Sequence, residues 1–266
     1  NRMIISFLKY INSLPFSLTI KHYQTFGKTA HLLKDNELNS MESWDALRIT
    51  HPQFSISKNR EEWLLACDAQ VKKDGQDGGL LQRARDISVL LKEKKLNSIF
   101  SVGVGGAGLE YQIKKNSPEV KIVCSEFAPE NVSLLKNVFI EADGIIRFDL
   151  LRGDWAEIKQ KYLSESSVCL MYRVDASFSD SQWREIFLNL HKTKIKNIIF
   201  IPSSFLTLRS IYNRKSRELK WFLLQKPVAF SGFLRTKKTF ESYWDGLYNE
   251  EFYEFGGIKG FFLSIR

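Results

Sequence analysis

Short apolar runs alternate with amphipathic stretches along the chain from residue 98 onward. The apolar runs predict buried strands at 98–102, 120–125, 144–149, 167–172 and 196–201. The stretches between them predict helices at 107–115, 129–140, 154–162 and 180–191. Strands and helices that alternate in this way build a parallel sheet with right-handed crossovers, so the sequence predicts a doubly wound α/β fold.

The C-terminal end of the chain has a different pattern. Residues 240–248 predict a helix. Two strand-like runs follow at 251–255 and 260–265, and glycines separate them. A parallel sheet that is followed by such a pair is expected to finish with an antiparallel hairpin.

The residues that precede the alternating region differ again. Helical periodicity dominates between residues 60 and 97, and a turn-forming cluster of Asp and Gly lies at 74–79. Residues 1–55 have no regular pattern. We therefore expect a mostly helical or irregular extension over residues 1–79 and a main domain over residues 80–266.

A glycine-rich turn follows the first predicted strand, and its residues are Gly103, Val104, Gly105, Gly106 and Gly108. Glycine lets the backbone turn tightly and approach a ligand without a Cβ atom. The helix that begins there presents free N–H groups. The next strand ends at Glu126, where a carboxylate accepts hydrogen bonds from ribose hydroxyls. This order of strand, glycine turn, helix, strand and acid predicts a binding site for a nucleoside cofactor.

This segment resembles the first motif of the class I S-adenosylmethionine (SAM)-dependent methyltransferases, and the likeness extends over roughly residues 80–266. The resemblance implies a Rossmann-like, mostly parallel seven-stranded sheet whose last strand is antiparallel. It also implies that SAM is the cofactor, with Glu126 on the ribose and Asp149 near the adenine. The other cofactor-binding residues that it implies, beside the glycine turn, are Phe127, Leu150 and Tyr172.

Two positions depart from the family's pattern. Ser101 stands where the family often has an acidic residue, which removes one expected contact toward the methionine end of SAM. Ala107 and Gly108 are both candidates for the motif's last glycine position, so the register there stays open. The departure at Ser101 leaves a degenerate, non-catalytic binding protein as one hypothesis.

The same glycines also satisfy the G-x-G-x-x-G spacing of dinucleotide-binding folds, and Glu126 follows them at a suitable distance. An NAD(P)-dependent oxidoreductase is therefore the rival enzyme hypothesis. Two features favour the methyltransferase. The glycine motif follows about a hundred residues, whereas a dinucleotide domain often opens a chain, and the closing pair of strands is typical of the methyltransferase sheet.

The stretch after the fourth predicted strand carries the candidate acceptor chemistry. It lacks the Asn/Asp-Pro-Pro-Tyr signature of methyltransferases that act on the amino groups of bases, which favours an oxygen acceptor. A hydroxyl acceptor must lose a proton, and Asp175 is the first candidate base, with His51 and His22 as further candidates. Asp175 also fits a structural role in the turn before the next helix. Arg173 is suited to hold an anionic acceptor, and no spacing of ligands indicates a metal, so we expect a metal-free reaction.

The chain is strongly basic, with a net charge of +9 and a pI of about 9.3, which favours anionic partners. Nine Lys and Arg residues against one acid lie between residues 204 and 240. Arg209 and Tyr212 are the substrate-binding candidates in this basic, aromatic segment. The segment fits a platform for an anionic small-molecule or glycan acceptor, a groove for RNA, an interfacial helix at a membrane, or a solvated helix.

Residues 172–202 are similar, at low specificity, to methyltransferases of bacterial surface-polysaccharide synthesis. A sugar O-methyltransferase is therefore the first hypothesis, and an RNA methyltransferase is the second. The three scattered cysteines indicate no disulfide framework, which favours a reducing compartment. No run reaches the roughly 18 apolar residues of a membrane span. We expect a cytoplasmic protein that contacts the inner face of the membrane peripherally.

Overall fold

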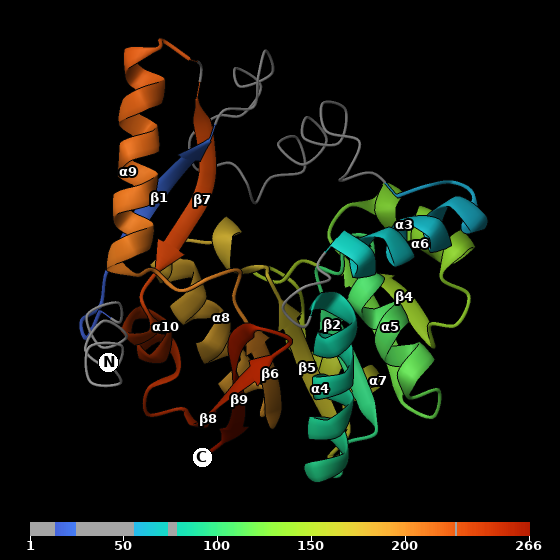
Figure 1. Cartoon of the computed structure of the whole chain (residues 1–266). Helices are drawn as coiled ribbons and strands as arrows, with labels where there is room; N and C mark the ends of the chain where they lie inside the picture. Colours follow the sequence, from blue (N-terminus) through green and yellow to red (C-terminus); the bar gives the residue numbers. More distant parts are fainter. Residues whose placement is uncertain (1–13, 25–55, 74–78, 227) are drawn as a thin grey trace, which may run out of the picture.

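The computed structural model describes residues 14–24, 56–73, 79–226 and 228–266, and these contain a seven-stranded sheet in the order β4-β3-β2-β5-β6-β9-β8 (Figure 1). Strands β4, β3, β2, β5 and β6 are parallel, and β9 runs antiparallel to both β6 and β8. The strands are β2 (Ser98–Val102), β3 (Lys121–Glu126), β4 (Gly144–Arg147), β5 (Ser167–Tyr172), β6 (Asn197–Ile201), β8 (Tyr248–Phe255) and β9 (Ile258–Ile265). The predicted fold class, with its antiparallel last strand, is confirmed.

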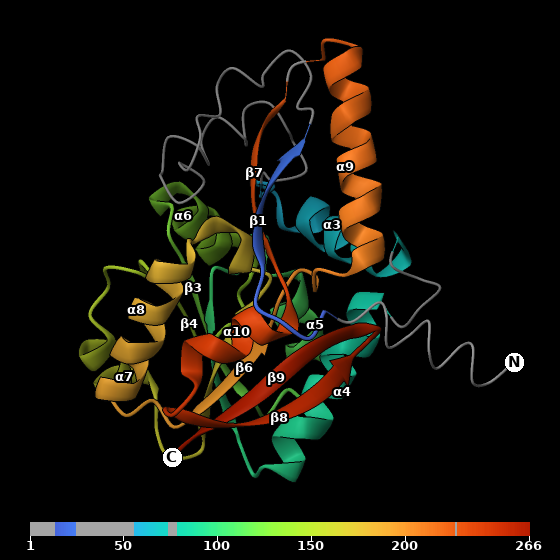
Figure 2. The same cartoon turned by 90° about the vertical axis from the view of Figure 1, so that its left-hand side faces the viewer.

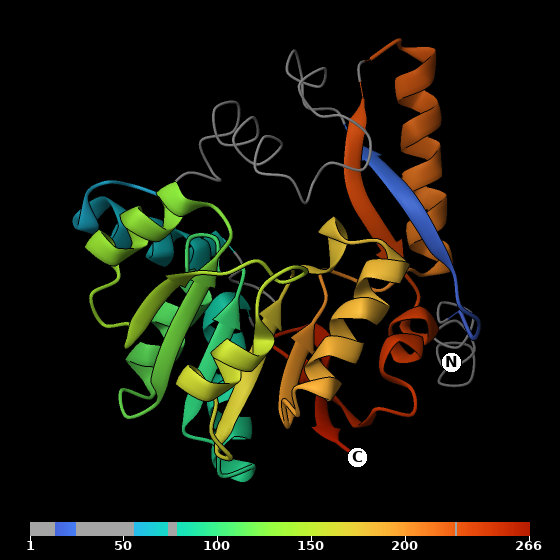
Figure 3. The ribbon, with the colours of Figure 1, turned by 180° about the vertical axis from the view of Figure 1, so that it is seen from behind.

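Helices cover both faces of this sheet (Figures 1 and 3). Side chains alternate across β2, so that Ile99 enters the core under one set of helices and Phe100 enters the core under the other. The first set is α3 (Arg60–Lys73), α4 (Gly79–Glu93), α5 (Gly108–Asn116) and α6 (Pro129–Val138). The second set is α7 (Trp155–Tyr162), α8 (Asp180–Lys192) and α10 (Lys237–Trp244). A sheet buried on both faces explains why its strands read as continuous apolar runs.

Strand β4 ends earlier than its apolar sequence predicts. Its last pair is Arg147 with Glu126, whereas the prediction ran to residue 149. Phe148 and Leu150 leave the strand and join the second core, where the Phe148 ring packs edge-on against Trp155. The apolar character of these residues therefore serves helix-side packing rather than strand pairing.

The predicted helix at 240–248 is shifted along the chain. Helix α10 begins after Thr236, whose hydroxyl oxygen accepts from the Thr239 N–H group, and it ends at Trp244. Gly246 then turns the chain with a φ of +76°, and Tyr248 already belongs to β8. The prediction missed the threonine cap and so placed the whole helix too late.

A second, two-stranded sheet joins distant parts of the chain and was not predicted. Strand β1 (Thr19–Gln24) pairs antiparallel with β7 (Ala229–Arg235), and helix α9 (Leu208–Leu223) packs beside β1. We call β1, α9 and β7 together the arm. Figure 2 shows the arm standing away from the large sheet. The pairing crosses the boundary that the sequence predicted at residue 79, because β7 belongs to the predicted main domain.

The arm is fixed to the main sheet where β7 crosses η3, a 3₁₀-helix (Asp175–Ser177) that follows β5. Gly232 permits this crossing, because a Cβ atom on it would lie 2.6 Å from the carbonyl oxygen of Ala176. Its φ of +111° also belongs to a region that side chains disfavour.

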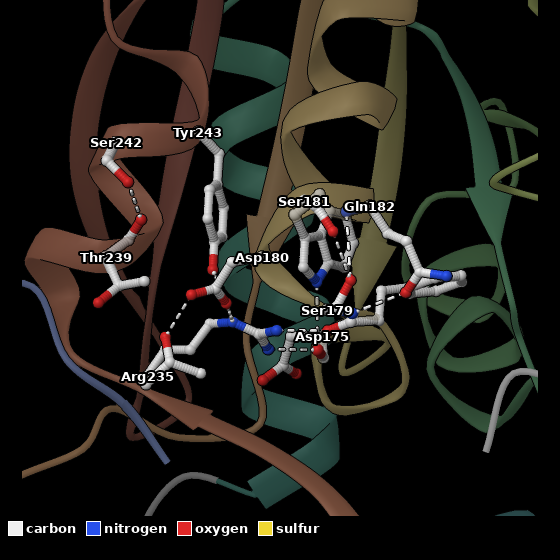
Figure 4. Close-up of polar contacts among 12 residues, drawn as sticks. Asp175, Ser179, Asp180, Ser181, Gln182, Arg235, Thr239, Ser242 and Tyr243 are labelled. Carbon is white, nitrogen blue, oxygen red and sulfur yellow. Dashed lines mark hydrogen bonds and ion pairs between the residues drawn. The ribbon is translucent and has the colours of Figure 1, made fainter. Parts of the chain in front are cut away.

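The Arg235 side chain, which is fully buried at the end of β7, forms the main polar anchor of the arm (Figure 4). Its Nε donates to Oδ1 of Asp180 over 2.8 Å, and its Nη1 donates to the backbone carbonyl of Asp175 over 2.8 Å. Its Nη2 donates to the carbonyl of Phe178. A buried guanidinium needs this full set of acceptors, because an unpaired charge in the interior is strongly destabilising.

Asp180 collects hydrogen bonds from three elements. Besides Arg235, the Tyr243 hydroxyl donates to its Oδ1 over 2.8 Å, and the Thr19 hydroxyl donates to its Oδ2 over 2.7 Å. Burial raises the pKa of Asp180, but the hydrogen bonds from Arg235, Thr19 and Tyr243 outweigh it and leave the pKa below its ordinary value. The ionised carboxylate therefore stabilises the junction of β1, β7, α8 and α10.

We predict that Asp180→Ala lowers the free energy of unfolding by about 3 kcal/mol, because it leaves the Arg235 charge buried without its carboxylate. Since the folded pKa lies below the ordinary value of roughly 3.9, this stabilisation is present above that pH and is lost as the pH falls through the folded pKa. Urea unfolding from neutral to acidic pH measures both effects. Glu157→Ala, which removes an exposed ion pair with Lys161, is the control and should cost at most about 0.5 kcal/mol. Equal losses in the two variants would contradict the role given to Asp180.

Candidate functional site

The glycine turn lies between β2 and α5 and combines packed and open positions. Gly103 has a φ of +66°, and a Cβ atom on it would lie 2.7 Å from Cγ1 of Val174. Gly105 has a φ of +54°, yet a Cβ atom on Gly105 or on Gly106 would meet no atom of the described residues within 4 Å. Gly103 therefore packs against the segment that follows β5, whereas Gly105 and Gly106 border open space.

Glu126 reaches the glycine turn from the end of β3. Its Oε2 accepts from the Gly105 N–H group over 2.9 Å, and its Oε1 accepts from the Phe127 N–H group over 3.0 Å. The structure thus brings together the predicted carboxylate and the predicted glycines at the carboxyl edge of the sheet. Ligands bind at this edge in open α/β folds.

The backbone shows how the two candidates for the last glycine position differ. Ala107 takes the left-handed conformation with a φ of +56°, and its N–H group donates to the Val104 carbonyl over 2.8 Å to close the turn. Gly108 instead begins α5, where a Cβ atom would lie 2.5 Å from Oε1 of Gln70. Both positions therefore have a reason to favour glycine, the left-handed backbone at 107 and the close packing at 108, and Ala107 takes its conformation at a cost of about 1 kcal/mol.

A buried carboxyl group lies beneath the glycine turn. The Ser101 hydroxyl donates to Oε1 of Glu110 over 2.6 Å, and both side chains are buried. Burial raises the pKa of Glu110 to about 7, although the hydrogen bond from Ser101 opposes the shift. The family's acidic position is thus a serine, and α5 supplies a carboxyl group directly to it. The sequence analysis missed Glu110, because no local signal marks which residue of an amphipathic helix faces Ser101.

Helix α3, which precedes the predicted main domain in the sequence, contacts the glycine turn. The indole Nε1 of Trp63 donates to the Gly106 carbonyl over 2.9 Å, and the Trp63 ring packs against Tyr111 and Phe139. The sequence predicted a helix here, but it gave no signal that this tryptophan reaches the turn.

Asp149 lies beyond the end of β4, whereas the sequence placed it within the predicted strand. Its Oδ1 accepts from the N–H groups of Leu151 and Arg152 over 2.9 and 3.1 Å, so the carboxylate orders the turn at this edge. The side chain of Leu150 is buried in the second core. The cofactor roles of Asp149 and Leu150 stay predictions.

The end of β5 carries Tyr172 and Arg173. The Tyr172 hydroxyl accepts from Nη1 of Arg83 over 2.7 Å, and the same guanidinium donates to the carbonyls of Phe255 and Gly256. Arg83 therefore ties β5 to the turn between β8 and β9. Arg173 is exposed and has a φ of +58°, a strained conformation for a residue with a side chain.

Asp175 is buried, with 1% of its surface exposed. Its Oδ1 accepts from the backbone N–H and the hydroxyl of Ser203 over 2.7 and 2.8 Å, which ties the end of β5 to the end of β6. Burial raises the pKa of Asp175, while the bonds from Ser203 and the charge of Arg235 oppose the shift. These contacts give it a structural role, and its catalytic role stays a prediction. His51 lies outside the described residues.

The two remaining substrate candidates lie on another element. Arg209 and Tyr212 are exposed on the first turns of α9, which rises away from the large sheet (Figure 2). Within the described ranges, no group of three or more His, Cys, Asp or Glu side chains is arranged to hold a metal ion. Among the described residues, no helix is both long and apolar enough to cross a membrane.

No protein-family profile and no curated protein sequence matches the chain. Solved structures do match. Human N-acetylserotonin methyltransferase in complex with SAM superposes with a TM-score of 0.52 at 19% identity, over 85% of this chain and 59% of that one. PigF with SAH gives 0.51 at 10% identity, over 84% and 70% of the two chains. Streptomyces venezuelae DesVI gives 0.50 at 9% identity, over 78% and 97%.

The chain thus spans 59% of the length of the human enzyme that it matches. At such low identities the likeness concerns the fold. Together with the strand order and the glycine turn at the carboxyl edge, it shows that this chain has the fold of the class I SAM-dependent methyltransferases.

Glycine-to-alanine substitutions test the difference between Gly103, which is packed against Val174, and Gly106, which borders open space. We predict that Gly103→Ala lowers the free energy of unfolding by about 1–2 kcal/mol, because its φ is left-handed and its Cβ overlaps Val174. Gly106→Ala should leave stability nearly unchanged, because its Cβ atom would contact none of the described residues. Thermal unfolding of both variants measures the difference. A loss for Gly106→Ala as large as that for Gly103→Ala would contradict the described turn.

Proposed function

We propose that this protein is a SAM-dependent methyltransferase. The observation that carries the proposal is the open space beside Gly105 and Gly106, with the Glu126 carboxylate held against the same turn. A nucleoside cofactor must lie close to the backbone of the turn, which requires free space there, and its ribose needs a carboxylate to accept hydrogen bonds. The two glycines provide the space, and Glu126 provides the carboxylate. When bound, SAM supplies an electrophilic methyl group.

The chain's own residues would bind and orient the cofactor. Glu126 would exchange its bond with the Gly105 N–H group for bonds with ribose hydroxyls, and Asp149 would border the adenine. The first turn of α5 adds the positive end of a helix dipole. The Trp63 bond to the Gly106 carbonyl and the Ser101–Glu110 pair hold the turn in shape before the cofactor arrives. Such preorganisation lowers the cost of binding.

We propose that the methyl group is transferred to a hydroxyl oxygen of an anionic acceptor molecule. Our first candidate is a sugar of surface-polysaccharide synthesis on the cytoplasmic side of the membrane. Arg173 supports this choice, because its strained backbone holds an exposed guanidinium at the carboxyl edge beside Tyr172. The acceptor oxygen must be aligned with the methyl group and must lose its proton. Asp175 is the proposed proton acceptor, and the partly exposed Ser203 hydroxyl connects this buried carboxylate to the site.

Binding of S-adenosylhomocysteine (SAH) tests the proposed cofactor. At about 100 times its dissociation constant, SAH should stabilise the folded state by about 2.7 kcal/mol, which a thermal-unfolding scan detects. Glu126→Ala should weaken binding on the order of 10- to 100-fold, because it removes hydrogen bonds to a charged acceptor. Gly106→Ala, whose Cβ projects into the open space, should also weaken binding. Lys161→Ala, on the exposed face of α7, is the control.

The outcomes separate the rival functions. A shift with NAD⁺ or NADP⁺ and none with SAH would replace the methyltransferase by the oxidoreductase. Silence with all three ligands would favour a non-catalytic binding protein. If SAH binds, a steep loss of RNA binding with rising salt would favour an RNA acceptor, because released counterions make that affinity salt-dependent.

A second prediction concerns Asp175. Because its folded pKa is raised, ionisation above the ordinary Asp pKa costs stability, and a neutral amide avoids that cost. Asp175→Asn still offers Oδ1 to Ser203, so its free energy of unfolding at pH 7 should equal or exceed that of the wild type. An aspartate that lowers the stability of the fold relative to asparagine is expected at a position that serves function. A loss of more than about 1 kcal/mol would instead make its charge a requirement of the fold.

A further inference from the structure

Helix α9 exposes a row of large apolar side chains. None of its described residues is fully buried. Tyr212, Leu219, Phe222 and Leu223 expose 74%, 59%, 78% and 71% of their surface. Residues three, four or seven positions apart share one face of a helix, so these side chains form a row on the exposed part of α9, with Lys215 between Tyr212 and Leu219. Scattered exposed apolar residues are normal, but a contiguous row of them marks an interaction surface.

The inner face of α9 is already occupied by the arm. Nη1 of Arg214 lies 2.7 Å from Nε2 of His22 on β1, and Ile211 packs against the small apolar cluster of Leu14, Leu206 and Leu234. The sole acid of α9, Glu218, lies on this inner side, with Oε1 4.0 Å from Nδ1 of His22. The outward apolar row is therefore separate from the face that holds the helix in the fold.

Exposed cations accompany the row. Arg209 and Lys220 lie along one side of it, and Lys226 lies beyond its far end. Lys215 lies within the row and is also ion-paired with Glu218, whereas Arg217 lies on the opposite side of the helix. At the far end, Phe222 and Leu223 continue into Leu224 and Val228, which are also exposed. This end lies farthest from the large sheet, whereas the Arg235 anchor holds the near end beside the carboxyl edge (Figures 1 and 2). The arm thus joins an apolar and basic surface to the edge that carries the candidate site.

We propose that the arm docks the protein on an anionic lipid bilayer, with the outward row of α9 in the headgroup region and its cations against lipid phosphates. Interfacial helices combine these two features, an apolar face and a basic flank. Each Lys or Arg near an anionic surface adds to the attraction. The docking would hold the carboxyl edge near an acceptor carried by the membrane, but it does not depend on the proposed methyl transfer.

Charge and side-chain type favour lipid over other occupants. A second copy bound through this face in two-fold symmetry would set the same cations opposite one another. Single-stranded RNA is held by stacking on aromatic rings. The row has only two rings, Tyr212 and Phe222, beside Leu219 and Leu223, and the exposed side chains that adjoin it, Leu208, Leu224 and Val228, are aliphatic and offer bases no ring to stack on.

Vesicle flotation of the full chain tests the proposal. The vesicles are phosphatidylcholine alone, and phosphatidylcholine with about 30% phosphatidylglycerol, an anionic surface. We expect binding to the anionic vesicles, and a loss on the order of 100-fold for Arg209→Gln/Lys220→Gln/Lys226→Gln, from three contacts that are each worth roughly tenfold or less. Lys92→Gln/Lys121→Gln/Lys136→Gln carries the same charge change on exposed residues outside the arm and should bind the vesicles nearly as tightly as the wild type.

The apolar row is tested separately. Phe222→Ser/Leu223→Ser should abolish flotation while the thermal-unfolding midpoint and the SAH-induced shift stay unchanged. Leu65→Ser/Ile140→Ser, at equally exposed apolar positions outside the arm, should still float. Equal losses in the arm and main-domain lysine variants would overturn the proposal, as would a dimer in sedimentation that Phe222→Ser/Leu223→Ser dissociates. A variant that no longer floats but is still stabilised by SAH as the wild type is would show that lipid docking and cofactor binding are separate properties.

Discussion

Burial of both faces of the seven-stranded sheet is the constraint on which the rest of the structure depends. Because helices cover each face, polar chemistry is confined to the strand ends, and the carboxyl ends of β2, β3, β4 and β5 meet at one edge. The glycine turn, Glu126 and Asp149 come from three separate strands and share that edge for this reason. Polar groups that remain inside must be paired, as the Ser101 hydroxyl and the Glu110 carboxyl are.

The same rule explains how the arm is attached. The arm is held at one end, and a single buried guanidinium, Arg235, donates to acceptors on η3, on the following turn and on α8. Removing the charge from water is costly, so the arrangement is stable only with all acceptors in place. This makes the junction specific in geometry, and it sets the base of the arm directly beside Asp175 and the end of β5. The position of α9 relative to the candidate site follows from that junction.

Much of the main domain could be predicted from the sequence, because its signals are local. Apolar runs and helical periodicity depend on neighbouring residues, and so does the spacing from the glycine turn to Glu126. The structure places Glu126 in hydrogen-bond contact with that turn. Where the prediction failed locally, at the end of β4 and at the start of α10, tertiary packing of Phe148 and the cap at Thr236 decided the outcome.

The remaining features depend on contacts between residues far apart in sequence. Strand β1 pairs with a strand about two hundred residues later, and no local pattern in either reveals the other. The bond from Trp63 to the Gly106 carbonyl and the bond from Ser203 to Asp175 are of the same kind. The motif therefore identified residues that lie at the carboxyl edge of the sheet, whereas the side chains that hold them in position emerged only with the fold.

The amide signal of Gly105 tests the central claim most directly. In the described structure this N–H group donates to the Glu126 carboxylate. The N–H group of Gly256, in the turn between β8 and β9, also donates to a carboxylate, that of Asp86 on α4, and serves as the control. NMR titration with SAH follows both amides in the intact chain. The account predicts a saturable shift of the Gly105 signal, together with its neighbours in the turn, and a smaller change or none at Gly256. An unchanged Gly105 signal at SAH concentrations that saturate a methyltransferase would contradict a SAM site at this turn.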